Sequence, residues 1–483
     1  MTPVHRVLDP QPVASLDQYV GDGGGRGLDA AGRLGAAGTL DEVEASGLRG
    51  RGGAGFPTGR KWRTVAANRS SAIPTTVVVN GAEGEPGSFK DRAILRANPY
   101  RVLEGALIAA GAVGADSIVV AVKRSFRAEV ERLAAAIDEV RAAGWSEGVD
   151  LLVVEGPAEY LYGEETALLE VIDGREPFPR VAPPYRRGVD EVGPDDADDA
   201  SPAQVRMAAP DHASAAPPTL VNNVETMANV ALVLAEGADW FRAVGTPESP
   251  GTIVCTVSGR TRRHGVAELP MGTPLREVID VVGRGPVRGR EIVAVMTGVS
   301  HPLVPAAQLD TPASYEGLDA IGSGLGTAGF IVFDDSTDLA AVARGVSRFL
   351  AVESCGQCTP CKQDGLALAD LFDQVRRSEA DEHDLEQIDD RVRTVADEAR
   401  CFLASQHQRV ASSILELFRP QLEAHVRGER AAVDEEPIVP IVDLEGDTFV
   451  LDEAQLAKQP DWTFDEEDSG RSPVERVDQR AGG

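Results

Sequence analysis

Four cysteines in the C-terminal part of the chain have the spacing of an iron–sulfur ligand set. Cys355, Cys358 and Cys361 stand three residues apart, and Cys401 follows after a stretch with a helical pattern. Three thiolates on successive turns can hold three corners of a cuboidal cluster, and the fourth corner then needs a ligand from elsewhere in the fold. Zinc is the competing metal, although structural zinc sites usually supply their ligands as two separated short motifs. The spacing therefore favours a [4Fe–4S] cluster held by these four residues over zinc.

A glycine-rich segment at residues 47–62 has the composition of an anion-binding loop. Gly50, Gly52 and Gly55 have the spacing of a dinucleotide fingerprint, but the residues before them indicate a helix and not the strand that a Rossmann turn requires. Glycines let backbone N–H groups converge on a phosphate, and Arg51 and Lys61 supply positive charge. The alternative is a flexible glycine-rich turn that binds nothing.

Polar residues follow the β-branched run at 77–79, which predicts a buried strand. Asn80 could hydrogen-bond the edge of a flavin ring, and Glu83 or Glu85 could accept from ribose hydroxyls or contact a nicotinamide, because open α/β sheets bind ligands where their strands end. The alternative is a strand-to-helix turn in which these carboxylates pair with the basic residues that follow them. From the residues alone, the ligand-binding and the structural interpretations are equally supported.

A third polar segment, at residues 160–168, combines aromatic residues and a glycine with two adjacent carboxylates, Glu164 and Glu165, at a predicted helix start. A binding role competes here with a simpler explanation. Acidic residues are favoured in the first turn of any helix because they complement its dipole.

Composition and length limit the classes of function. The chain has 483 residues, which predicts two to four domains, and a net charge of −30, which argues against nucleic-acid binding. No apolar run is long enough to cross a bilayer, and the N-terminus lacks a leader pattern. Only five cysteines occur, and the fifth, Cys255, is predicted to be a core residue in a strand. We therefore expect a cytoplasmic protein, with any membrane association coming through partners.

The order of apolar patterns divides the chain into five parts. From Thr75 onward, short β-branched runs alternate with helical ones, which predicts a parallel sheet covered by helices. Residues after 251 indicate a β-grasp-type domain, and residues after 339 indicate four helices, one of them opened by the cysteine triplet. The predicted parts are a loose N-terminal arm (1–39), an α/β domain (40–245), a β-grasp domain (246–336), a four-helix domain (337–428) and an acidic tail (429–483).

Five segments, taken in order, resemble the NADH-binding flavoprotein subunit of respiratory complex I and the diaphorase subunits of NAD-linked hydrogenases and formate dehydrogenases. They are Gly-Arg-Gly-Gly-Ala-Gly-Phe-Pro-Thr-Gly-Arg-Lys-Trp at 50–62, Glu-Gly-Glu-Pro-Gly-Ser-Phe-Lys-Asp-Arg at 83–92, Gly-Glu-Glu-Thr-Ala-Leu-Leu at 163–169, Pro-Thr-Leu-Val-Asn-Asn-Val-Glu-Thr at 218–226 and Ser-Cys-Gly-Gln-Cys-Thr-Pro-Cys at 354–361. The resemblance covers about residues 40 to 427.

The resemblance implies both a fold and a reaction. The fold is a Rossmann-like α/β domain that holds FMN, a ubiquitin-like soluble-ligand-binding β-grasp (SLBB) domain, and a C-terminal four-helix bundle with a [4Fe–4S] cluster. The reaction is hydride transfer from NADH to FMN, followed by passage of single electrons to the cluster. The implied acceptor is a thioredoxin-like [2Fe–2S] subunit or a ferredoxin, alone or within a larger redox complex.

The resemblance also assigns residues. The implied FMN contacts are Gly50, Arg51, Gly52, Lys61, Asn80, Tyr160, Gly163, Glu164, Asn222, Asn223 and Thr226. The implied NADH contacts are Phe56, Lys61, Glu85 and Glu165, with Lys61 and Glu85 closest to the chemistry, and Tyr185 falls near an adenine-stacking position.

Departures from the family pattern indicate a divergent member. Ala82 replaces a carboxylate near the flavin, Thr64 replaces an aromatic on the adenine side, and residues 402–406 differ from the small acidic pattern usual after the fourth cysteine. An acidic insertion at 190–199 is also unusual. Two further hypotheses therefore stand beside NADH oxidation: a non-catalytic iron–sulfur scaffold or redox sensor, and a module that runs backward as a ferredoxin:NAD reductase.

Overall fold

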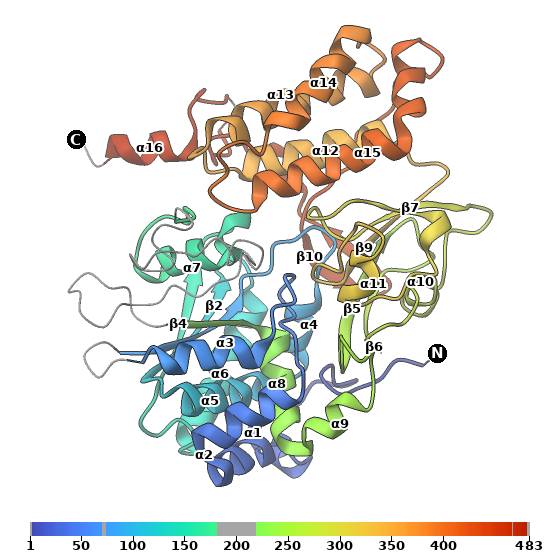
Figure 1. Ribbon diagram of the computed structural model, residues 1–483. Coiled ribbons are helices and arrows are strands. Elements are labelled where there is room, and N and C mark those ends of the chain that lie inside the picture. The colour runs from blue at the N-terminus through green and yellow to red at the C-terminus, as the bar shows by residue number, and fades with distance from the viewer. Residues whose placement is uncertain (1, 70–73, 181–218, 466, 481–483) are drawn as a thin grey trace, which may run out of the picture.

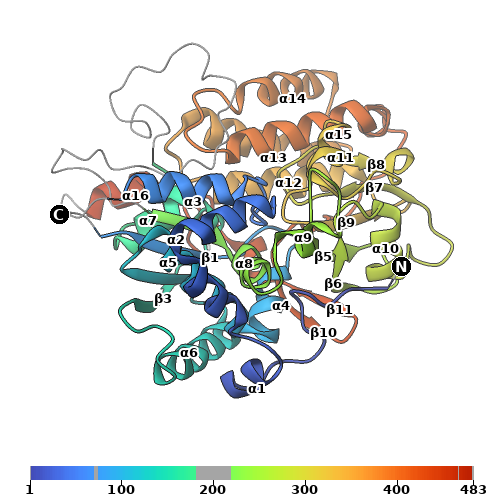
Figure 2. The same ribbon diagram turned by 60° about the horizontal axis from the view of Figure 1, so that its bottom comes forward.

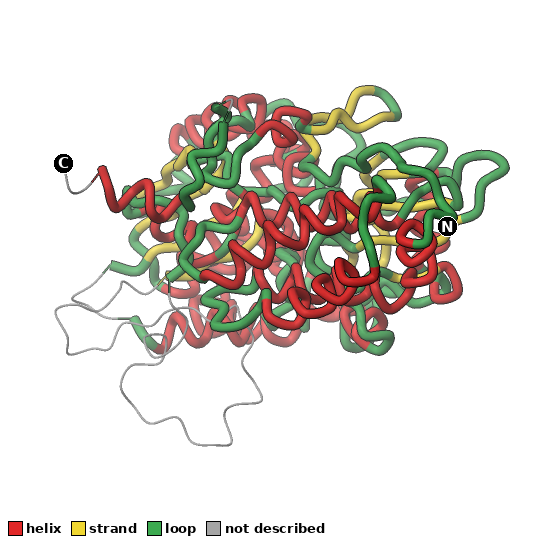
Figure 3. The backbone as a smooth tube through the Cα atoms, turned by 90° about the horizontal axis from the view of Figure 1, so that it is seen from above, coloured by secondary structure: helices red, strands yellow, loops and turns green. Residues whose placement is uncertain are grey.

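The structure is a computed structural model that describes residues 2–69, 74–180, 219–465 and 467–480. Figure 1 shows three parts: an α/β part at the lower left, a smaller β part at the right and a helical part at the top. Figure 3 looks down on the molecule, with helices across the centre of the view. No helix among the residues described is both long enough and apolar enough to cross a membrane.

A four-stranded parallel sheet forms the centre of the α/β part and confirms the sheet predicted from the sequence. Its strands are β1 (Thr76–Gly81), β2 (Ser117–Lys123), β3 (Asp150–Gly156) and β4 (Thr219–Asn223), in the order β3-β2-β1-β4. The chain proceeds outward from β1 through β2 to β3 and then returns to place β4 on the other side of β1. The strand order therefore reverses between β1 and β4, which is where open α/β sheets bind ligands.

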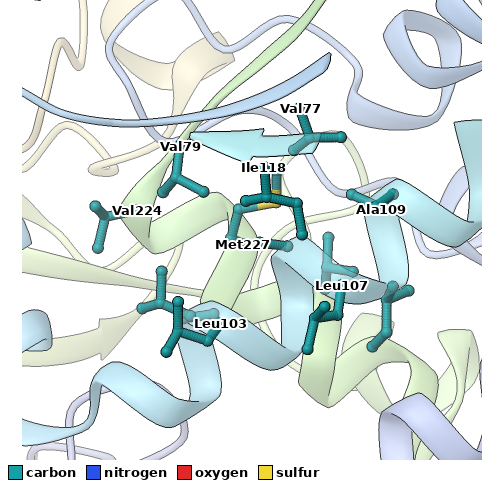
Figure 4. Packing of buried hydrophobic residues seen from close by; sticks show 14 of the residues in the cluster. Val77, Val79, Leu103, Leu107, Ala109, Ile118, Val224 and Met227 are labelled. Carbon is teal, nitrogen blue, oxygen red and sulfur yellow. The ribbon is translucent and has the colours of Figure 1, made fainter. Parts of the chain in front are cut away.

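Helices cover both faces of this sheet. Alternate residues of β1 point to opposite sides: Val77 and Val79 join one core, while Val78 joins a second core. The larger face packs against α5 and α8, as the side chains of Leu103, Leu107, Val224 and Met227 show in Figure 4. The helices of the α/β part are α4 (Lys90–Ala97), α5 (Pro99–Val113), α6 (Arg127–Ala142), α7 (Glu165–Ile172) and α8 (Val224–Glu236), with α7 on the smaller face.

The expectation of a loose N-terminal arm over residues 1–39 is wrong for the segment from residue 16 onward. This segment forms α1 (Leu16–Gly21) and most of α2 (Arg26–Ala45), and α3 (Thr58–Ala67) follows. The buried Glu104 carboxylate of α5 accepts hydrogen bonds from Tyr19 Oη at 2.5 Å and from the Gly25 amide at 2.9 Å. The glycines and alanines that suggested looseness instead allow close packing, since a Cβ on Gly27 would overlap the Ala231 carbonyl oxygen of α8.

The smaller β part, called here the small β domain (residues 252–334), contains a five-stranded mixed sheet. Its strands are β5 (Thr252–Gly259), β6 (Gly265–Pro270), β7 (Ile292–Met296), β8 (Val304–Pro305) and β9 (Gly329–Asp334), in the order β6-β5-β9-β7-β8. Strands β5 and β9 are parallel, and the remaining pairs are antiparallel. The short α9 (Ala238–Arg242) precedes the sheet, α10 (Leu275–Gly283) packs on it, and α11 (Tyr315–Asp319) precedes β9.

Four helices form the helical part, and their existence confirms the helical pattern read after residue 339. They are α12 (Leu339–Glu353), α13 (Thr359–Arg376), α14 (Glu382–Thr394) and α15 (Leu403–Val426). Helix α13 begins within the cysteine triplet, and Pro360 stands in its first turn, where a missing N–H costs nothing. Cys361 therefore lies in the first turn of α13, and Cys401 lies just before α15.

The C-terminal segment, expected from the sequence to be an acidic tail, contains regular elements over its described residues from 429 to 480. It forms the hairpin β10 (Ile441–Glu445) and β11 (Thr448–Leu451) and ends in α16 (Pro473–Arg480). Figure 2 shows the hairpin beside α4, where the Phe449 and Phe89 rings lie 5.7 Å apart. Three buried apolar residues attach this segment to the rest of the molecule: Ile438, Ile441 and Phe449.

Two glycines of α5 allow the contact between α5 and α8 to be tested. A Cβ on Gly105 would overlap the Met227 carbonyl oxygen, whereas a Cβ on Gly111 meets no atom within 4 Å. We expect Gly105→Ala to destabilise the protein by about 1–3 kcal/mol, because backbone atoms must move apart. Gly111→Ala should be neutral or stabilise by up to about 1 kcal/mol, since alanine favours helix. Urea unfolding followed by circular dichroism measures both, and equal stability of the two variants would contradict the packing.

Candidate functional site

The glycine-rich segment forms a fixed turn between α2 and α3. The amide of Gly50 donates to the Phe56 carbonyl at 2.8 Å, and an isolated β-bridge joins Arg49 to Pro57. Gly53 and Gly55 have φ values of 121° and 63°, which residues with a Cβ rarely adopt. A Cβ on Gly55 would also meet the Tyr315 ring at 2.5 Å. The loop therefore has a defined shape, and its role in binding an anion stays a prediction.

The side chain of Arg51 is part of the fold and not of an open anion site. Its guanidinium is fully buried and donates to the carbonyls of Arg49, Pro250 and Thr252 at 3.0, 3.0 and 3.1 Å. Its backbone amide donates to Thr226 Oγ1 at 2.9 Å. The expectation that this guanidinium supplies charge to a phosphate is therefore corrected: it fastens the loop to the small β domain.

Lys61 places a nearly buried positive charge beside the loop. It lies on α3 with 7% of its surface exposed, and its Nζ lies 3.1 and 3.2 Å from the two carboxylate oxygens of Glu165 at the start of α7. The next residue, Trp62, is fully buried and donates from Nε1 to Asn222 Oδ1 at 2.7 Å. Helix α3 thus holds a nearly buried ammonium group against α7 beside the end of β4.

Amide side chains gather where β1 and β4 end. Asn80 donates to the Gly163 carbonyl at 2.9 Å and accepts from the Ala82 amide at 3.1 Å. Asn223 accepts from the Glu225 amide at 2.9 Å, which caps α8, and accepts from the Lys90 ammonium at 3.1 Å. The structure therefore brings the glycine loop and Lys61 together with the ends of β1 and β4.

Glu83 fits the second interpretation from the sequence, a strand-to-helix turn in which the carboxylates pair with basic residues. It accepts from Ser88 Oγ at 2.6 Å and pairs with Arg92 Nε at 3.1 Å. Burial pushes the pKa of Glu83 up, but Arg92 and Lys90 outweigh burial and hold that pKa below its ordinary value. A carboxylate engaged in this way stabilises the loop and is not available to a ligand.

Glu85 has no such cationic partner among the described residues, and it joins three parts of the molecule. Its Oε2 accepts from Tyr160 Oη at 2.5 Å, and its Oε1 accepts from the Val299 amide at 2.7 Å and from Ser300 Oγ at 3.2 Å. Burial raises the pKa of Glu85 above its ordinary value, although these hydrogen bonds oppose the shift. The residue is half-buried and not fully enclosed.

Tyr160 lies between Glu85 and the helical part. Its backbone amide donates to Glu353 Oε2 at 2.8 Å, at the end of α12, and its hydroxyl lies 3.3 Å from Gln406 Oε1 of α15. Burial and the neighbouring Glu85 carboxylate raise the pKa of Tyr160 well above its ordinary value, so the phenol stays neutral. Gln406 and Glu353 were not predicted as partners, because both come from helices distant in the chain.

The four predicted cluster ligands line one hollow. Cys355 and Cys361 are buried, Cys358 and Cys401 are half-buried, and all four are free thiols. The other lining residues are Leu161, Pro179, Ser354, Gln357, Arg400 and Leu403. Gln357 Nε2 donates to Cys355 Sγ at 3.4 Å, and Ser354 Oγ lies 3.3 Å from Cys361 Sγ, so hydrogen-bonding groups already surround the sulfurs. Four thiols around one hollow fit a cuboidal cluster.

No three His, Cys, Asp or Glu side chains in the described ranges converge tightly enough to bind a single metal ion. Burial raises the pKa of the Cys361 thiol to about 11, and a bound metal centre must therefore displace its proton.

Lys362 is a neighbour of the hollow that was not predicted from the sequence. Its buried ammonium group donates to the carbonyls of Ala351 and Ser354, both at 2.9 Å, and so caps the end of α12. A buried cation beside four thiolates offsets part of the negative charge of a ligated cluster. The signal for it was the lysine directly after Cys361, but a sequence alone does not show whether such a lysine faces inward.

The remaining predicted contacts have mixed placements. Gly52 packs against Asn223, where a Cβ would meet the asparagine Cβ at 3.2 Å, and Phe56 is half-buried in the glycine turn. Glu164 caps α7 by accepting from the amides of Thr166 and Ala167 at 2.9 and 2.8 Å, which supports the helix-start explanation for this residue. Tyr185 lies outside the described residues.

Comparison with known proteins adds independent information. A family model described as the Nuo51 FMN-binding domain matches residues 43–232, and one described as the NADH-ubiquinone oxidoreductase-F iron–sulfur binding region matches residues 341–425. The chain is 34% identical to an NADH-quinone oxidoreductase F subunit of Rhizobium meliloti over 86% of its own length and 95% of the relative. It is 34% identical to the corresponding F-type protein of Aquifex aeolicus over 86% and 92%.

A solved structure is also similar. A chain of the NAD+-reducing [NiFe]-hydrogenase in the H2-reduced state superposes with a TM-score of 0.73 and 32% identity, over 88% of this chain and 67% of that one.

If the hollow binds a cluster, alanine substitutions at its cysteines should lower the iron content, and substitution of a cysteine elsewhere should not. Alanine at Cys361 or at Cys401 should lower bound iron from about four atoms per chain towards zero, because a cuboidal cluster loses a corner ligand. Cys255→Ala is the control, since this fully buried cysteine lies in a strand of the small β domain. Iron and sulfide analysis of anaerobically purified protein measures the effect. Full iron content in Cys401→Ala would remove Cys401 from the ligand set.

Proposed function

The chain belongs to the family of NADH-quinone oxidoreductase F subunits, and on that premise we propose that it oxidises NADH through FMN and passes electrons to a [4Fe–4S] cluster. The observation that carries the proposal is the pairing of two sites in one molecule. A fixed glycine loop with a nearly buried lysine lies at the switch point of the parallel sheet, and a hollow lined by four cysteines lies in the adjoining helical part. The matched FMN-binding and iron–sulfur regions coincide with these two sites.

We further propose how the parts correspond to domains. Residues 40–245 make the FMN- and NADH-binding domain, residues 246–336 an SLBB-type β-grasp domain, and residues 337–428 a four-helix bundle around the cluster. The mixed sheet with α10 packed on it supports the β-grasp assignment, and the mutual packing of α12 to α15 supports the bundle. The segment from 429 onward lies beyond the matched iron–sulfur region.

Bound FMN supplies chemistry that no side chain has, since it accepts two electrons as a hydride and releases them one at a time. The chain's own residues then have to bind and orient. The backbone amides of the turn at Gly50 to Gly55 would bind the flavin phosphate, and Lys61 would offset negative charge on the flavin. Glu85 accepts a hydrogen bond from the nucleotide and fixes its position, which needs no proton transfer.

The residues around the hollow hold the cluster and adjust its charge. The four cysteines are its ligands, Gln357 and Ser354 hydrogen-bond to sulfur, and Lys362 places a cation beside them. Hydrogen bonds and nearby charges of this kind set the reduction potential of such clusters. Arg400 and Gln357 interact at 3.1 Å at the rim of the hollow, where Cys358 and Cys401 are half-buried.

We propose a partner that takes electrons one at a time: a thioredoxin-like [2Fe–2S] subunit or a ferredoxin, within a larger redox complex. The relatives named as subunits of a quinone oxidoreductase and the similarity to a hydrogenase support a complex. Attachment to a membrane would then come from other subunits, and the site of action would be the cytoplasm.

One specific observation supports the reverse direction of the reaction, in which electrons from a reduced partner reduce NAD+. The similar solved structure is an NAD+-reducing enzyme. The same residues serve both directions, because a site that stabilises a transition state does so whichever way the reaction runs. The direction in the cell is then set by the potential of the partner.

The direct test is an anaerobic titration of the flavin- and cluster-loaded protein with NADH, followed by flavin absorbance. We expect rapid bleaching of the flavin band, and reoxidation when NAD+ is added in excess. Flavin that is bound but stays oxidised with both NADH and NADPH would refute the hydride mechanism. Protein that binds the cluster but no flavin would favour the scaffold hypothesis.

Lys61 predicts a change in flavin potential. Lys61→Met should lower the two-electron potential of the bound flavin by roughly 30 mV or more, because removing a nearby cation destabilises the reduced, more negative ring. Arg63→Met is the matched control, since Arg63 lies on the same helix but is exposed and pairs with Asp41 and Glu44. Dye-equilibrated spectroscopic titration measures both. Equal potentials in the two variants would place Lys61 away from the flavin.

A further inference from the structure

We propose that the small β domain positions the nucleotide-site carboxylate Glu85 through its loop at residues 297–301. The inference rests on the proposed function, because it assumes that Glu85 meets the nucleotide. It gives this domain a defined part in NAD(H) binding: it would hold an acceptor oxygen on the α/β part in the orientation that a nucleotide hydroxyl or amide requires.

Two donors from this loop converge on one oxygen. The Val299 amide donates to Glu85 Oε1 at 2.7 Å, and Ser300 Oγ donates to the same atom at 3.2 Å. Tyr160 Oη donates to the other oxygen, Oε2, at 2.5 Å. A carboxylate that is held at both oxygens loses its freedom to rotate, so its orientation is set before a ligand arrives.

Gly298 shows that the loop is shaped to approach Glu85. Its φ is 72°, and a Cβ built on it would overlap Glu85 Oε1. Any other residue would therefore be strained in its backbone and would also push the carboxylate away. The close approach needs glycine at this position, in addition to the two hydrogen bonds.

The loop itself is held firmly from two sides. Val299 is fully buried in the core of the helical part, and the Leu303 amide donates to Ser413 Oγ of α15 at 3.1 Å. From the other side, Ser323 Oγ donates to the Pro302 carbonyl at 2.6 Å. The loop is therefore anchored to the helical part and to the small β domain. It can act as a rigid support for Glu85 of the α/β part, to which the Val299 amide and the Ser300 hydroxyl donate hydrogen bonds.

The hydrogen bonds leave Glu85 with capacity for a ligand. An ionised carboxylate has about four acceptor positions, and the three donors occupy two on Oε1 and one on Oε2. The remaining position on Oε2 can accept from a nucleotide donor. Glu85 is half-buried, so part of the residue is exposed.

The pH at which Glu85 becomes protonated distinguishes a loop that orients this carboxylate from a loop that only stabilises the protein. Burial raises its pKa, and the hydrogen bonds from Tyr160, Val299 and Ser300 oppose that shift. Removing the Ser300 hydroxyl should therefore raise the pKa further, and the carboxylate would be lost at a higher pH. Of the other groups near this site, burial raises the pKa of Tyr160, so the phenol stays neutral, and burial with the nearby Arg409 lowers the pKa of His301 to about 4. Burial lowers the pKa of Lys123 to about 8, so any change of this ammonium falls at the upper end of the pH range and not on the acid limb.

The experiment measures NAD+ binding to the flavin- and cluster-loaded protein by calorimetry between pH 5 and 8. For Ser300→Ala we expect about tenfold weaker binding and an acid limb displaced upward by about one pH unit. Ser300→Thr keeps the hydroxyl and should restore both. Ser323→Ala is the matched control, since Ser300 and Ser323 have 8% and 9% of their surface exposed and both belong to the small β domain, but Ser323 does not touch Glu85.

A second measurement tests the support without any nucleotide. In Glu85→Gln, hydrogen–deuterium exchange should rise in peptides containing Val299, because the charged acceptor of that amide is lost. Unchanged exchange there, or a Ser300→Ala variant that binds NAD+ like Ser323→Ala, overturns the inference. If exchange rises but no variant and no wild-type protein binds NAD+, the loop does hold Glu85 and the proposed function fails instead.

Discussion

The arrangement of the two sites depends on one buried carboxylate, that of Glu353 at the end of α12. It accepts from Lys458 Nζ at 2.7 Å, from Gln455 Nε2 at 2.5 Å and from the Tyr160 amide at 2.8 Å. Burial alone would raise the pKa of Glu353, but Lys458 and these hydrogen bonds hold it below its ordinary value. A buried charge is tolerated only when it is paired, so this group ties the helical part, the α/β part and the C-terminal segment together.

The same group explains why the C-terminal segment is ordered despite its acidic composition. Lys458, one of its few basic residues, is buried and supplies the cation that Glu353 requires. Further along, Trp462 Nε1 donates to the Val352 carbonyl at 2.9 Å, and the Val474 amide donates to the Cys355 carbonyl at 3.1 Å. The segment thus contacts the last turn of α12 and the first cysteine, and it completes the surroundings of the hollow.

The sequence predicted most of what local pattern determines. Parallel strands, the helices after residue 339 and the four cysteines follow from periodicity and spacing, which are properties of neighbouring residues. Long-range partners could not be read in this way. Nothing near Arg51 indicates that its guanidinium would bind the Pro250 carbonyl, and nothing near Glu85 indicates the Val299 amide as its donor. Glycine and alanine near the N-terminus predicted looseness because close helix packing depends on a partner, α8, about two hundred residues away.

Glu83 and Glu85 show how environment separates two identical side chains in one loop. Glu83 faces the Arg92 guanidinium and Lys90, which keep its pKa low and occupy its oxygens with structural bonds. Glu85 lies two residues further on, and its donors within the described part of the chain are neutral, so burial raises its pKa and one acceptor position stays open. A carboxylate that is oriented but not neutralised keeps its attraction for a ligand's hydrogen-bond donors. The fold therefore uses cations to build the loop and neutral donors to prepare the site.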